Sequence, residues 1–363
     1  MKLMLCGDVV PTAVSAAAFE RGDVHAVFGG MEHEFARADA VIVNLECALT
    51  DSDAAIRKCG PNLKGRPSCA GTLRKAGVTH AGLSNNHVYD FGADGLEDTM
   101  RALEGEGIAW FGAGRDLADS RRPLVIEREG MRAGVIAVCE HEYSYALEHA
   151  MGAAPFDPFV TPADVRRLRP EVDLLIVMYH GGKEQCQYPS PRLRRACRAL
   201  VEAGADIVLT QHSHCIGCRE SYMGNEIVYG QGNFCFVEHG DHPHWRSGLA
   251  LEVEVRDGIK RLRYIPVVTE GEGIMPAPQA EADAILAGFE ERSRLIEDEA
   301  SCEAQWRAFC EGVRAQYTAA ARDAFAEGDK PRQIFGHYLD CEAHLDVWQT
   351  LFETWRRTDP VER

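Results

Sequence analysis

Apolar and polar positions alternate along most of the chain in a way that predicts short buried strands with helices between them. Apolar runs such as 3–6, 40–43 and 207–209 are typical of strands covered on both faces, because neither face carries polar residues. Between such runs, apolar residues recur at helical spacing, as Leu96 and Met100 do. We therefore expect an α/β fold in which strands and helices alternate.

The bounds of the expected elements follow from these patterns and from the glycines and prolines that interrupt them. Helices are expected at 14–21, 31–37, 69–76, 94–104 and 189–203, and strands at 3–6, 40–43, 78–83, 108–111, 123–128, 132–139, 173–179, 207–209, 226–229, 249–255 and 260–267. Segments 50–66 and 140–170 are expected to be loops, and the second is a candidate to cover the site.

The pattern changes after about residue 270, where helical spacing replaces the strand pattern. We therefore expect a domain of residues 1–270 followed by a helical extension of residues 271–363. Large apolar residues recur at helical intervals in the extension, at Trp306, Phe309, Val313 and Tyr317 and again at Leu345, Trp348, Phe352 and Trp355. Packing of these helices onto each other and onto the sheet domain is the favoured interpretation, and a lid or dimer face is the alternative.

Composition and charge restrict the partners of the chain. Of its 363 residues, 45% are hydrophobic and 26% are charged, and its formal net charge is −17. This charge argues against nucleic acid or an anionic membrane as a partner, because both are polyanions that need clustered Lys and Arg. It permits a small anionic or peptide-like substrate held at a local positive centre, which a metal ion would provide. The composition is also compatible with a homo-oligomer.

The apolar runs and the cysteines indicate the cellular compartment in which the protein is expected. No apolar run is long enough to span a bilayer, and the stretch at 1–6 is too short for a secretory signal. We therefore expect a cytoplasmic protein, and 13 scattered cysteines, an odd number, agree with reduced thiols. Cys215 and Cys218 form a CxxC pair without further zinc ligands at matching spacing, so we interpret them as buried thiols, with a redox role as the alternative.

Polar side chains follow several of the expected strands directly. The set comprises Asp8, Glu46, Asn86, His180, His212 and His214. In an open α/β sheet, ligands bind just beyond the carboxyl ends of the strands, so these groups should converge on one crevice. Carboxylate, amide and imidazole groups together suit a divalent transition metal, and two such ions can share a bridging carboxylate. Each residue alone has a simpler explanation, such as a helix cap or a turn, but those explanations would have to hold at every strand end.

Four further residues are candidates to bind a substrate, and one is a candidate for proton transfer. His87, next to Asn86, would protonate a leaving group as a general acid. Lys58 and Lys64 would hold an anionic group, although a solvated loop explains them equally well. Lys183 and Glu184 lie beside His180, and Glu184 would orient a ligand or a substrate amine.

Several segments of the chain resemble the CapA family of bacterial capsule-synthesis or poly-γ-glutamate-synthesis proteins. The matching segments are Gly7-Asp8-Val9-Val10, Asn44-Leu45-Glu46, Ser84-Asn85-Asn86-His87 with Asp90 and Gly92, His180-Gly181-Gly182-Lys183-Glu184 with Pro189-Ser190-Pro191, Gly204-Ala205-Asp206 before His212-Ser213-His214, and Tyr229-Gly230-Gln231-Gly232-Asn233-Phe234. They run in family order over residues 1 to about 255, and the last part of the chain has no such match. The resemblance implies a calcineurin-like metallophosphatase fold, a four-layer αββα sandwich, with an added C-terminal helical region.

The resemblance also implies roles for the site residues. Asp8 would ligate one metal ion and Glu46 would bridge, with Asn86, His180 and His212 completing one site and His214 serving the other. The cofactor would be one or two divalent ions of manganese, iron or zinc. The implied activity is a metal-dependent hydrolase in which a metal-activated hydroxide attacks a phosphoester or a γ-glutamyl-type amide. The alternative is a catalytically reduced binding or accessory protein of a polymer-synthesis system.

Three departures concern the site, of which the first is from the wider superfamily and is shared by the CapA relatives, and the other two are local departures from the family. Val10 stands where the wider superfamily has a histidine, which leaves the first metal site with fewer protein ligands. Gly181 stands where the family usually has Trp, and Thr210-Gln211 where it usually has Gly-His. These two changes would reshape the pocket without removing a ligand.

Overall fold

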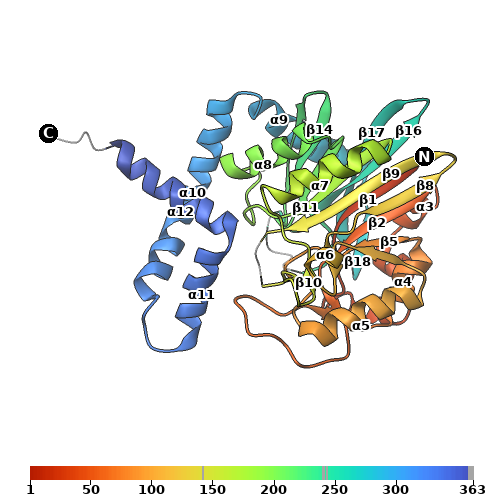
Figure 1. Ribbon diagram of the computed structural model, residues 1–363, viewed down its shortest axis with the longest axis horizontal. Coiled ribbons are helices and arrows are strands. Elements are labelled where there is room, and N and C mark those ends of the chain that lie inside the picture. Colours follow the sequence, from red (N-terminus) through yellow and green to blue (C-terminus); the bar gives the residue numbers. More distant parts are fainter. Residues whose placement is uncertain (141–142, 239–241, 243, 359–363) are drawn as a thin grey trace.

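Two β-sheets packed face to face form the body of the protein, and helices cover the outer face of each sheet (Figure 1). The computed structural model describes residues 1–140, 143–238, 242 and 244–358, with only the backbone described for 354–358. Within these residues, no helix combines the length and the apolar character needed to cross a membrane.

The first sheet has eight strands. In spatial order they are β18 (Gly273–Pro276), β17 (Ile259–Glu270), β16 (Ser247–Arg256), β1 (Lys2–Val10), β2 (Ala40–Leu45), β5 (His80–Gly82) and β6 (Ala109–Phe111), with β15 (Asn233–Phe236) paired to the end of β1. The strands from β1 to β6 in this order are parallel, whereas β16, β17 and β18 are antiparallel to their neighbours.

The second sheet has six strands. They are β13 (Ile216–Tyr222), β14 (Asn225–Gln231), β12 (Ile207–Gln211), β11 (Leu174–His180), β9 (Met131–Cys139) and β8 (Leu124–Arg128). The four inner strands are parallel and the two edge strands are antiparallel. Two small ladders lie outside the sheets, β3 (Ala48–Leu49) with β4 (Lys64–Gly65) and β7 (Ala113–Gly114) with β10 (Gly152–Ala153).

The helices divide into outer layers and a C-terminal group. They are α1 (Ala16–Glu20), α2 (Val24–Phe28), α3 (Met31–Phe35), α4 (Cys69–Ala76), α5 (Gly92–Gly105), α6 (Leu117–Ser120), α7 (Val160–Leu168) with a 3₁₀ turn at Arg169–Glu171, α8 (Pro191–Glu202), α9 (Gln279–Leu295), α10 (Glu299–Asp323), α11 (Asp329–Asp340) and α12 (Glu342–Thr358). Figure 1 shows α10, α11 and α12 standing to one side of the sandwich.

Three apolar cores separate the four layers. Along β1, Leu3 and Leu5 point between the sheets, while Met4 and Cys6 point toward the helices of the first layer. This alternation follows from the two-residue period of a strand, and it explains why a strand buried on both faces is apolar throughout. On the far side, residues of β11 such as Val177 pack against α7 and α8. The expected αββα sandwich is confirmed.

The sequence patterns located most elements and missed several short ones. The helix at Cys69–Ala76 has the expected bounds, and the hairpin of β8 and β9 is present. The expectation of a loop throughout 140–170 is wrong, because Val160–Leu168 is a helix. The pattern also missed α2, β13, β15 and β18.

The C-terminal helices pack as the apolar spacing suggests. Trp306 and Tyr317 of α10 are buried with Tyr338 of α11 and Val347 of α12 in a separate apolar cluster. Phe352 is 56% exposed, and the side chain of Trp355 lies outside the described residues. The sheet itself continues to β18, past residue 270, and α9 packs on the sandwich through Phe289. The division into two domains stays a prediction.

Candidate metal centre

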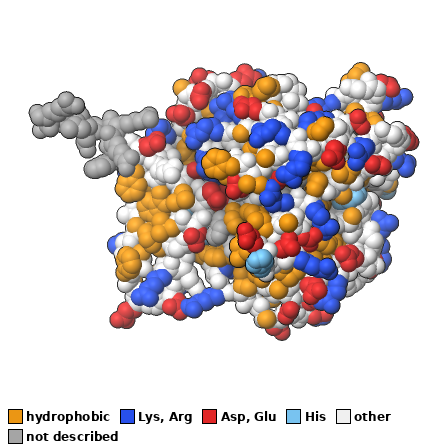
Figure 2. Space-filling model, in the orientation of Figure 1, with side chains coloured by type: hydrophobic (Ala, Val, Ile, Leu, Met, Phe, Trp, Pro, Cys, Tyr) orange, Lys and Arg blue, Asp and Glu red, His pale blue; other side chains and the backbone are white. Residues whose placement is uncertain are grey.

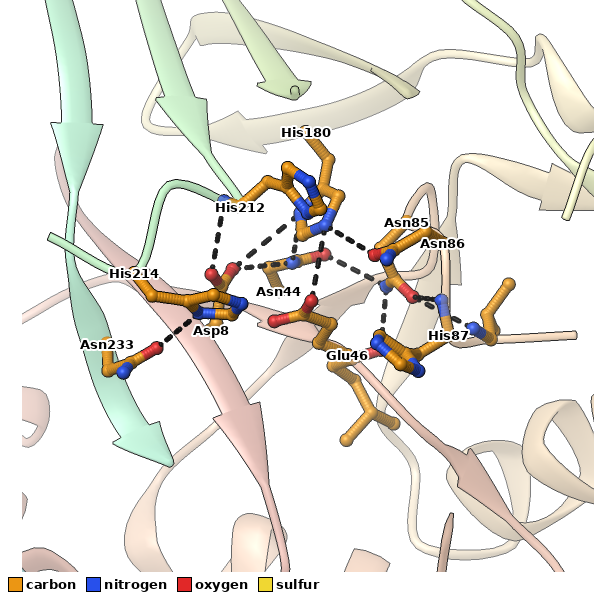
Figure 3. A network of polar contacts seen from close by, with 12 residues as sticks. Asp8, Asn44, Glu46, Asn85, Asn86, His87, His180, His212, His214 and Asn233 are labelled. Atoms are coloured by element: carbon orange, nitrogen blue, oxygen red, sulfur yellow. Dashed lines mark hydrogen bonds and ion pairs between the residues drawn. The ribbon is translucent and has the colours of Figure 1, made fainter. Parts of the chain in front are cut away.

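Side chains from both sheets meet at the carboxyl ends of β1, β2, β5, β11 and β12 (Figure 3). Two groups of three have ligand atoms within 4.8 Å of one another, Asp8 with Glu46 and His180, and Glu46 with His212 and His214. Glu46 belongs to both groups. Asn86 joins them, because its Oδ1 lies 2.9 Å from His180 Nε2. The structure therefore brings together the ligand set that the sequence suggested.

An irregularity in β1 places Asp8. The register of β1 against β2 shifts between Leu5 and Asp8, and the register against β15 shifts after Asp8. Such irregularities turn a side chain out of the usual alternation of a strand. A Cβ at the preceding Gly7 would lie 2.7 Å from the carbonyl oxygen of Gly232, so the close approach of these two segments requires glycine.

The backbone conformation of the His212-Ser213-His214 turn is unusual. His212 and His214 have φ values of 86° and 52°, in the left-handed region that residues with a Cβ rarely adopt. Strain of this kind is retained at functional sites when the surrounding structure enforces it. Here it directs both imidazoles toward the carboxylates, and the His212 N–H donates to Asp8 Oδ2 at 3.2 Å.

Glu46 provides the clearest test of whether the residues fit a metal ion. Its side chain is fully buried, and neither carboxylate oxygen has a hydrogen-bond partner among the described residues. The nearest basic nitrogen is His180 Nε2 at 3.3 Å from Oε1, which is an ion-pair contact without hydrogen-bond geometry. A buried carboxylate without hydrogen bonds is very unfavourable, and a shared cation would satisfy both oxygens. The donor set therefore fits one or two divalent ions.

Asparagine side chains hold the ligands in place. The Asn44 amide nitrogen donates to Asp8 Oδ1 at 2.7 Å and to His180 Nδ1 at 3.0 Å. Asn85 donates to Asn44 Oδ1 and to the Leu45 carbonyl, and its own Oδ1 accepts from the backbone N–H groups of the following turn. These bonds connect the ends of β1, β2, β5 and β11, so the ligand positions depend on one another.

His214 is oriented by a partner outside the ligand set. Its Nδ1 lies 2.8 Å from Asn233 Oδ1, and the Asn233 amide nitrogen donates to the Trp245 carbonyl at 3.3 Å. The Asn233 oxygen therefore accepts from Nδ1–H, which leaves Nε2 as the nitrogen for a metal ion. The Trp245 ring packs against the imidazole with centroids 4.5 Å apart.

Burial and mutual repulsion shift the pKa values of the ligands. Burial, and then Glu46, raise the pKa of Asp8 to about 6, and burial raises the pKa of Glu46. Burial lowers the pKa of His180 to about 4 and also lowers that of His212. Burial acts against protonation of His214 as well, but Glu46, Glu184 and Asp8 outweigh it and raise its pKa.

His87 is part of a buried charged trio. Its Nδ1 lies 2.6 Å from Asp90 Oδ2 and 3.1 Å from Lys58 Nζ, and Lys58 Nζ lies 2.5 Å from Asp90 Oδ1. Burial, and then the charge of Lys58, lower the pKa of His87, while Asp90 opposes the shift. Lys58 is thus close to the centre, but its charge is already paired.

The other three candidate substrate residues have different surroundings. Lys64 Nζ donates hydrogen bonds to the Ser52 carbonyl and to Asp53, and it lies over the Phe91 ring. None of its described contacts is with the metal centre. Lys183 and Glu184 lie 3.9 Å apart, with side chains 10% and 49% exposed.

The residues at the three departures noted in the sequence have distinct surroundings. Val10 is buried in the apolar core of the first helix layer and offers no ligand atom. A Cβ at Gly181 would lie 2.7 Å from side-chain atoms of Glu140, so this carboxylate occupies the space that a larger side chain at 181 would need. The Gln211 amide nitrogen donates hydrogen bonds to the Cys6 carbonyl and to Gln231 Oε1, and the first of these bonds links β12 to β1. Cys215 and Cys218 are both buried, as expected.

Sequence reasoning assigned no role to the residues that position the ligands. Asn44 lies two residues before Glu46, and Asp90 lies three residues after His87, so the proximity of these two residues to the predicted site residues in the sequence was a usable indication. Glu140 follows the strand β9 directly, which is the same position that identified the ligands.

Two stacked mixed sheets between helical layers, with buried carboxylate, amide and imidazole groups at the strand ends, define a calcineurin-like metallophosphoesterase fold with a candidate metal site. The family described as "Bacterial capsule synthesis protein PGA_cap" matches residues 2–238. The chain belongs to this family.

Curated relatives agree with this assignment. The chain is 26% identical over 282 residues to "Capsule biosynthesis protein CapA" of Bacillus anthracis, covering 75% of this chain and 68% of the relative. It is 26% identical over 239 residues to "PGA biosynthesis protein CapA" of Bacillus subtilis (strain 168), covering 63% and 62%. It is 30% identical over 232 residues to a "Probable polyglutamine synthesis accessory protein" of Mycobacterium tuberculosis, covering 59% and 60%. The chain thus spans about two thirds or less of the length of these relatives.

Some solved structures show a distant similarity to this chain. A hypothetical protein from Thermus thermophilus gives a TM-score of 0.47 at 19% identity, covering 75% of this chain and 100% of that one. A "Putative 5'-Nucleotidase from Staphylococcus aureus", solved with alpha-ketoglutarate, gives 0.46 at 13% identity, covering 80% and 58%.

Proposed function

We propose that the protein is a metal-dependent hydrolase that cleaves a phosphoester or a γ-glutamyl-type amide. The observation that carries the proposal is Glu46, whose two buried oxygens lack hydrogen-bond partners among the described residues and which belongs to both ligand groups. A bound divalent ion would polarise the substrate and supply a nucleophile from water at neutral pH.

The residues of the chain then have separate tasks. Asp8, Glu46, Asn86, His180, His212 and His214 hold the ions, and Asn44 and Asn233 orient them. His87 protonates the leaving group, with Asp90 fixing its ring through Nδ1. Burial and the charge of Lys58 lower the pKa of His87 and so oppose its protonation, whereas Asp90 favours the protonated form that donates.

A substrate panel tests the proposal. Protein reloaded with manganese, iron or zinc is assayed for release of phosphate from phosphoesters and of glutamate from γ-glutamyl amides. We expect His212→Ala to lose bound metal and activity together, and His87→Gln to keep its metal but lose activity by roughly 10²–10⁴-fold. His33→Ala, an exposed histidine on α3, is the matched control. If metal-loaded wild-type protein turns over none of these compounds, the proposal that the protein is a hydrolase is wrong.

A second candidate function is an accessory protein of a polymer-synthesis system that keeps the fold and the metal but not the reaction. Val10 favours it, because this buried residue leaves the first ligand group without the histidine of the wider superfamily. One group of relatives also carries the printed name of an accessory protein. This role requires bound metal, retained on purification and lost in His212→Ala, together with no turnover in the panel.

A further inference from the structure

Segment 181–185 connects two stretches of chain that carry candidate ligands. It begins directly after His180, and the N–H of its first residue donates to the Gln211 carbonyl at 3.1 Å. At its other end, the Gln185 N–H donates to the Ser213 carbonyl at 2.7 Å. Both carbonyl groups belong to residues next to a histidine ligand of the turn after β12. The position of this segment therefore affects three candidate ligands, one before it and two in the turn.

Glu140 holds the chain on both sides of His180. Its carboxylate accepts from the Tyr179 hydroxyl at 3.0 Å and from the Gly182 N–H at 3.2 Å, and its own N–H donates to the His180 carbonyl at 3.0 Å. A Cβ at Gly181 would lie 2.7 Å from two side-chain carbons of Glu140, so this side chain packs directly against the backbone of the segment. Glu140 thus fixes the path of the chain as it leaves the ligand.

A single arginine joins Glu140 to the helix α12. Arg192 Nη2 lies 2.6 Å from Glu140 Oε1, and Arg192 Nε lies 3.0 Å from both carboxylate oxygens of Asp346 in α12. The side chains of Glu140 and Asp346 are 2% and 6% exposed, and that of Arg192 is 27% exposed. The planar guanidinium contacts both carboxylates at once, so its position on Glu140 depends on Asp346.

We propose that Glu140, Arg192 and Asp346 are positioning residues for the metal centre, so that α12 sets the metal affinity of the sandwich. Asp346 orients Arg192, Arg192 compensates and orients Glu140, and Glu140 fixes the segment on which three histidines depend. The inference rests on the proposed function only in taking the site to bind a divalent ion. It gives the C-terminal helices, which lie outside the family match at residues 2–238, a part in forming the centre.

The metal affinity of two single variants tests this inference. Mn²⁺ binding is measured by calorimetry for the wild type, Glu140→Gln and Asp346→Asn, since both substitutions keep the size of the side chain and remove its charge. We expect Glu140→Gln to weaken binding by about tenfold or more, as the loss of a group that supports a metal ligand does. Asp346→Asn should weaken it by about threefold or more, although this residue lies on α12. Unchanged affinity in either variant, or no Mn²⁺ binding by the wild type, overturns the inference.

A double-mutant cycle tests whether Asp346 acts through Glu140. In that case Asp346→Asn should weaken Mn²⁺ binding by less than about twofold in a Glu140→Gln background. Losses that multiply in the double variant would show that α12 affects the centre by another route, which overturns the proposed path. If Glu140→Gln does not fold, Arg192→Lys takes its place in the cycle, because it keeps the charge and loses the planar fork.

Glu220→Gln is the matched control for a general loss of stability. Glu220 is 10% exposed and forms ion pairs with Arg194 and Arg198, so it is a comparable buried carboxylate on the same helix, α8. This cluster shares no residue with the path from Asp346 to Glu140. We expect Glu220→Gln to lower the free energy of unfolding in urea and to leave Mn²⁺ affinity within about twofold of the wild type. An affinity loss as large as that of Glu140→Gln would attribute both effects to instability and overturn the inference.

Turnover in the substrate panel separates this inference from the hydrolase. If Mn²⁺ binding weakens in both variants while the wild type turns over no compound, the positioning role is supported and the hydrolase is wrong. If the wild type turns over a compound while the variants keep its metal affinity, the hydrolase is supported and the positioning role is wrong.

Discussion

Lys58, in the loop between β3 and β4, and Lys64, the first residue of β4, show how much the surroundings of a side chain matter. Lys58 is 2% exposed and pairs with Asp90, which is fully buried, whereas Lys64 is 32% exposed and pairs with Asp53, which is 97% exposed. Removing one partner of a buried pair leaves an uncompensated charge, while an exposed pair contributes little.

We expect Lys58→Met to lower the free energy of unfolding by roughly 3 kcal/mol, because Asp90 would stay buried without its cation. Lys64→Met, the matched control at the start of β4, should change the free energy of unfolding by less than about 1 kcal/mol. Urea unfolding of both variants measures the difference. Equal effects of the two substitutions would show that Lys58 is not in the buried pair.

Metal binding should depend on pH through Asp8 and His214. Both have raised pKa values, so Asp8 takes up a proton as the pH falls through about 6, and His214 takes one up at a higher pH than an ordinary histidine does. A protonated ligand cannot coordinate, so affinity is retained above this range and lost below it. We expect affinity for Mn²⁺ to fall by about tenfold or more between pH 7 and pH 5, measured by calorimetry. Constant affinity over this interval would contradict the ligand assignment.

At the scale of elements, the sequence located strands better than short helices. β1, β2, β11 and β12 are buried on both faces, so continuous apolar runs identify them. The helix α7 was missed because prolines surround it, yet Pro162 lies in its first turn, where the missing N–H has no helical partner in any case. The strand β18 has only four residues, of which one is glycine and one is proline, so it gives no strand signature.

The site residues could be predicted where they directly follow a strand that the sequence also predicts. Ligands directly after apolar runs could be found because parallel strands bring their carboxyl ends to one edge. Asn233 could not be given a role, because its approach to His214 depends on the pairing of β15 with β1. The contact of His337 with Tyr143 had no indication in the sequence, since it depends on the packing of α11.

The first turn of α8 links the sandwich to the C-terminal helices. Ser190 caps this helix by accepting from the Leu193 N–H at 3.0 Å, and its hydroxyl donates to Asp346 of α12 at 2.5 Å. Asp346 also pairs with Arg192, which in turn pairs with Glu140 beside Gly182. Thus one polar chain runs from α12 to the segment that follows His180.

We expect Ser190→Ala to lower the free energy of unfolding by about 1–2 kcal/mol, through loss of both the cap and the bond to Asp346. Ser68→Ala is a suitable control, because Ser68 stands at the same position of α4 but makes no capping bond through its side chain. Chemical denaturation compares the two. A Ser68→Ala effect as large as that of Ser190→Ala would show that the bonds of Ser190 contribute nothing.

At the scale of the whole molecule, the net charge of −17 opposes polyanionic partners. Figure 2 shows acidic and basic side chains interspersed over the face in view. We expect no binding of labelled duplex DNA in fluorescence anisotropy even at low salt, where electrostatic binding is strongest. A basic protein of similar size serves as the positive control. Salt-dependent binding by this chain would show that a local basic surface outweighs the overall charge.

The position of Glu46 in both ligand groups means that two cations there cannot load independently. The first to arrive neutralises a carboxylate that the second also needs, yet it fixes that carboxylate in the orientation the second requires. If both groups bind a cation, as the proposed function requires, limiting metal would give a mixture of singly and doubly loaded molecules. Their proportion would follow the metal supply.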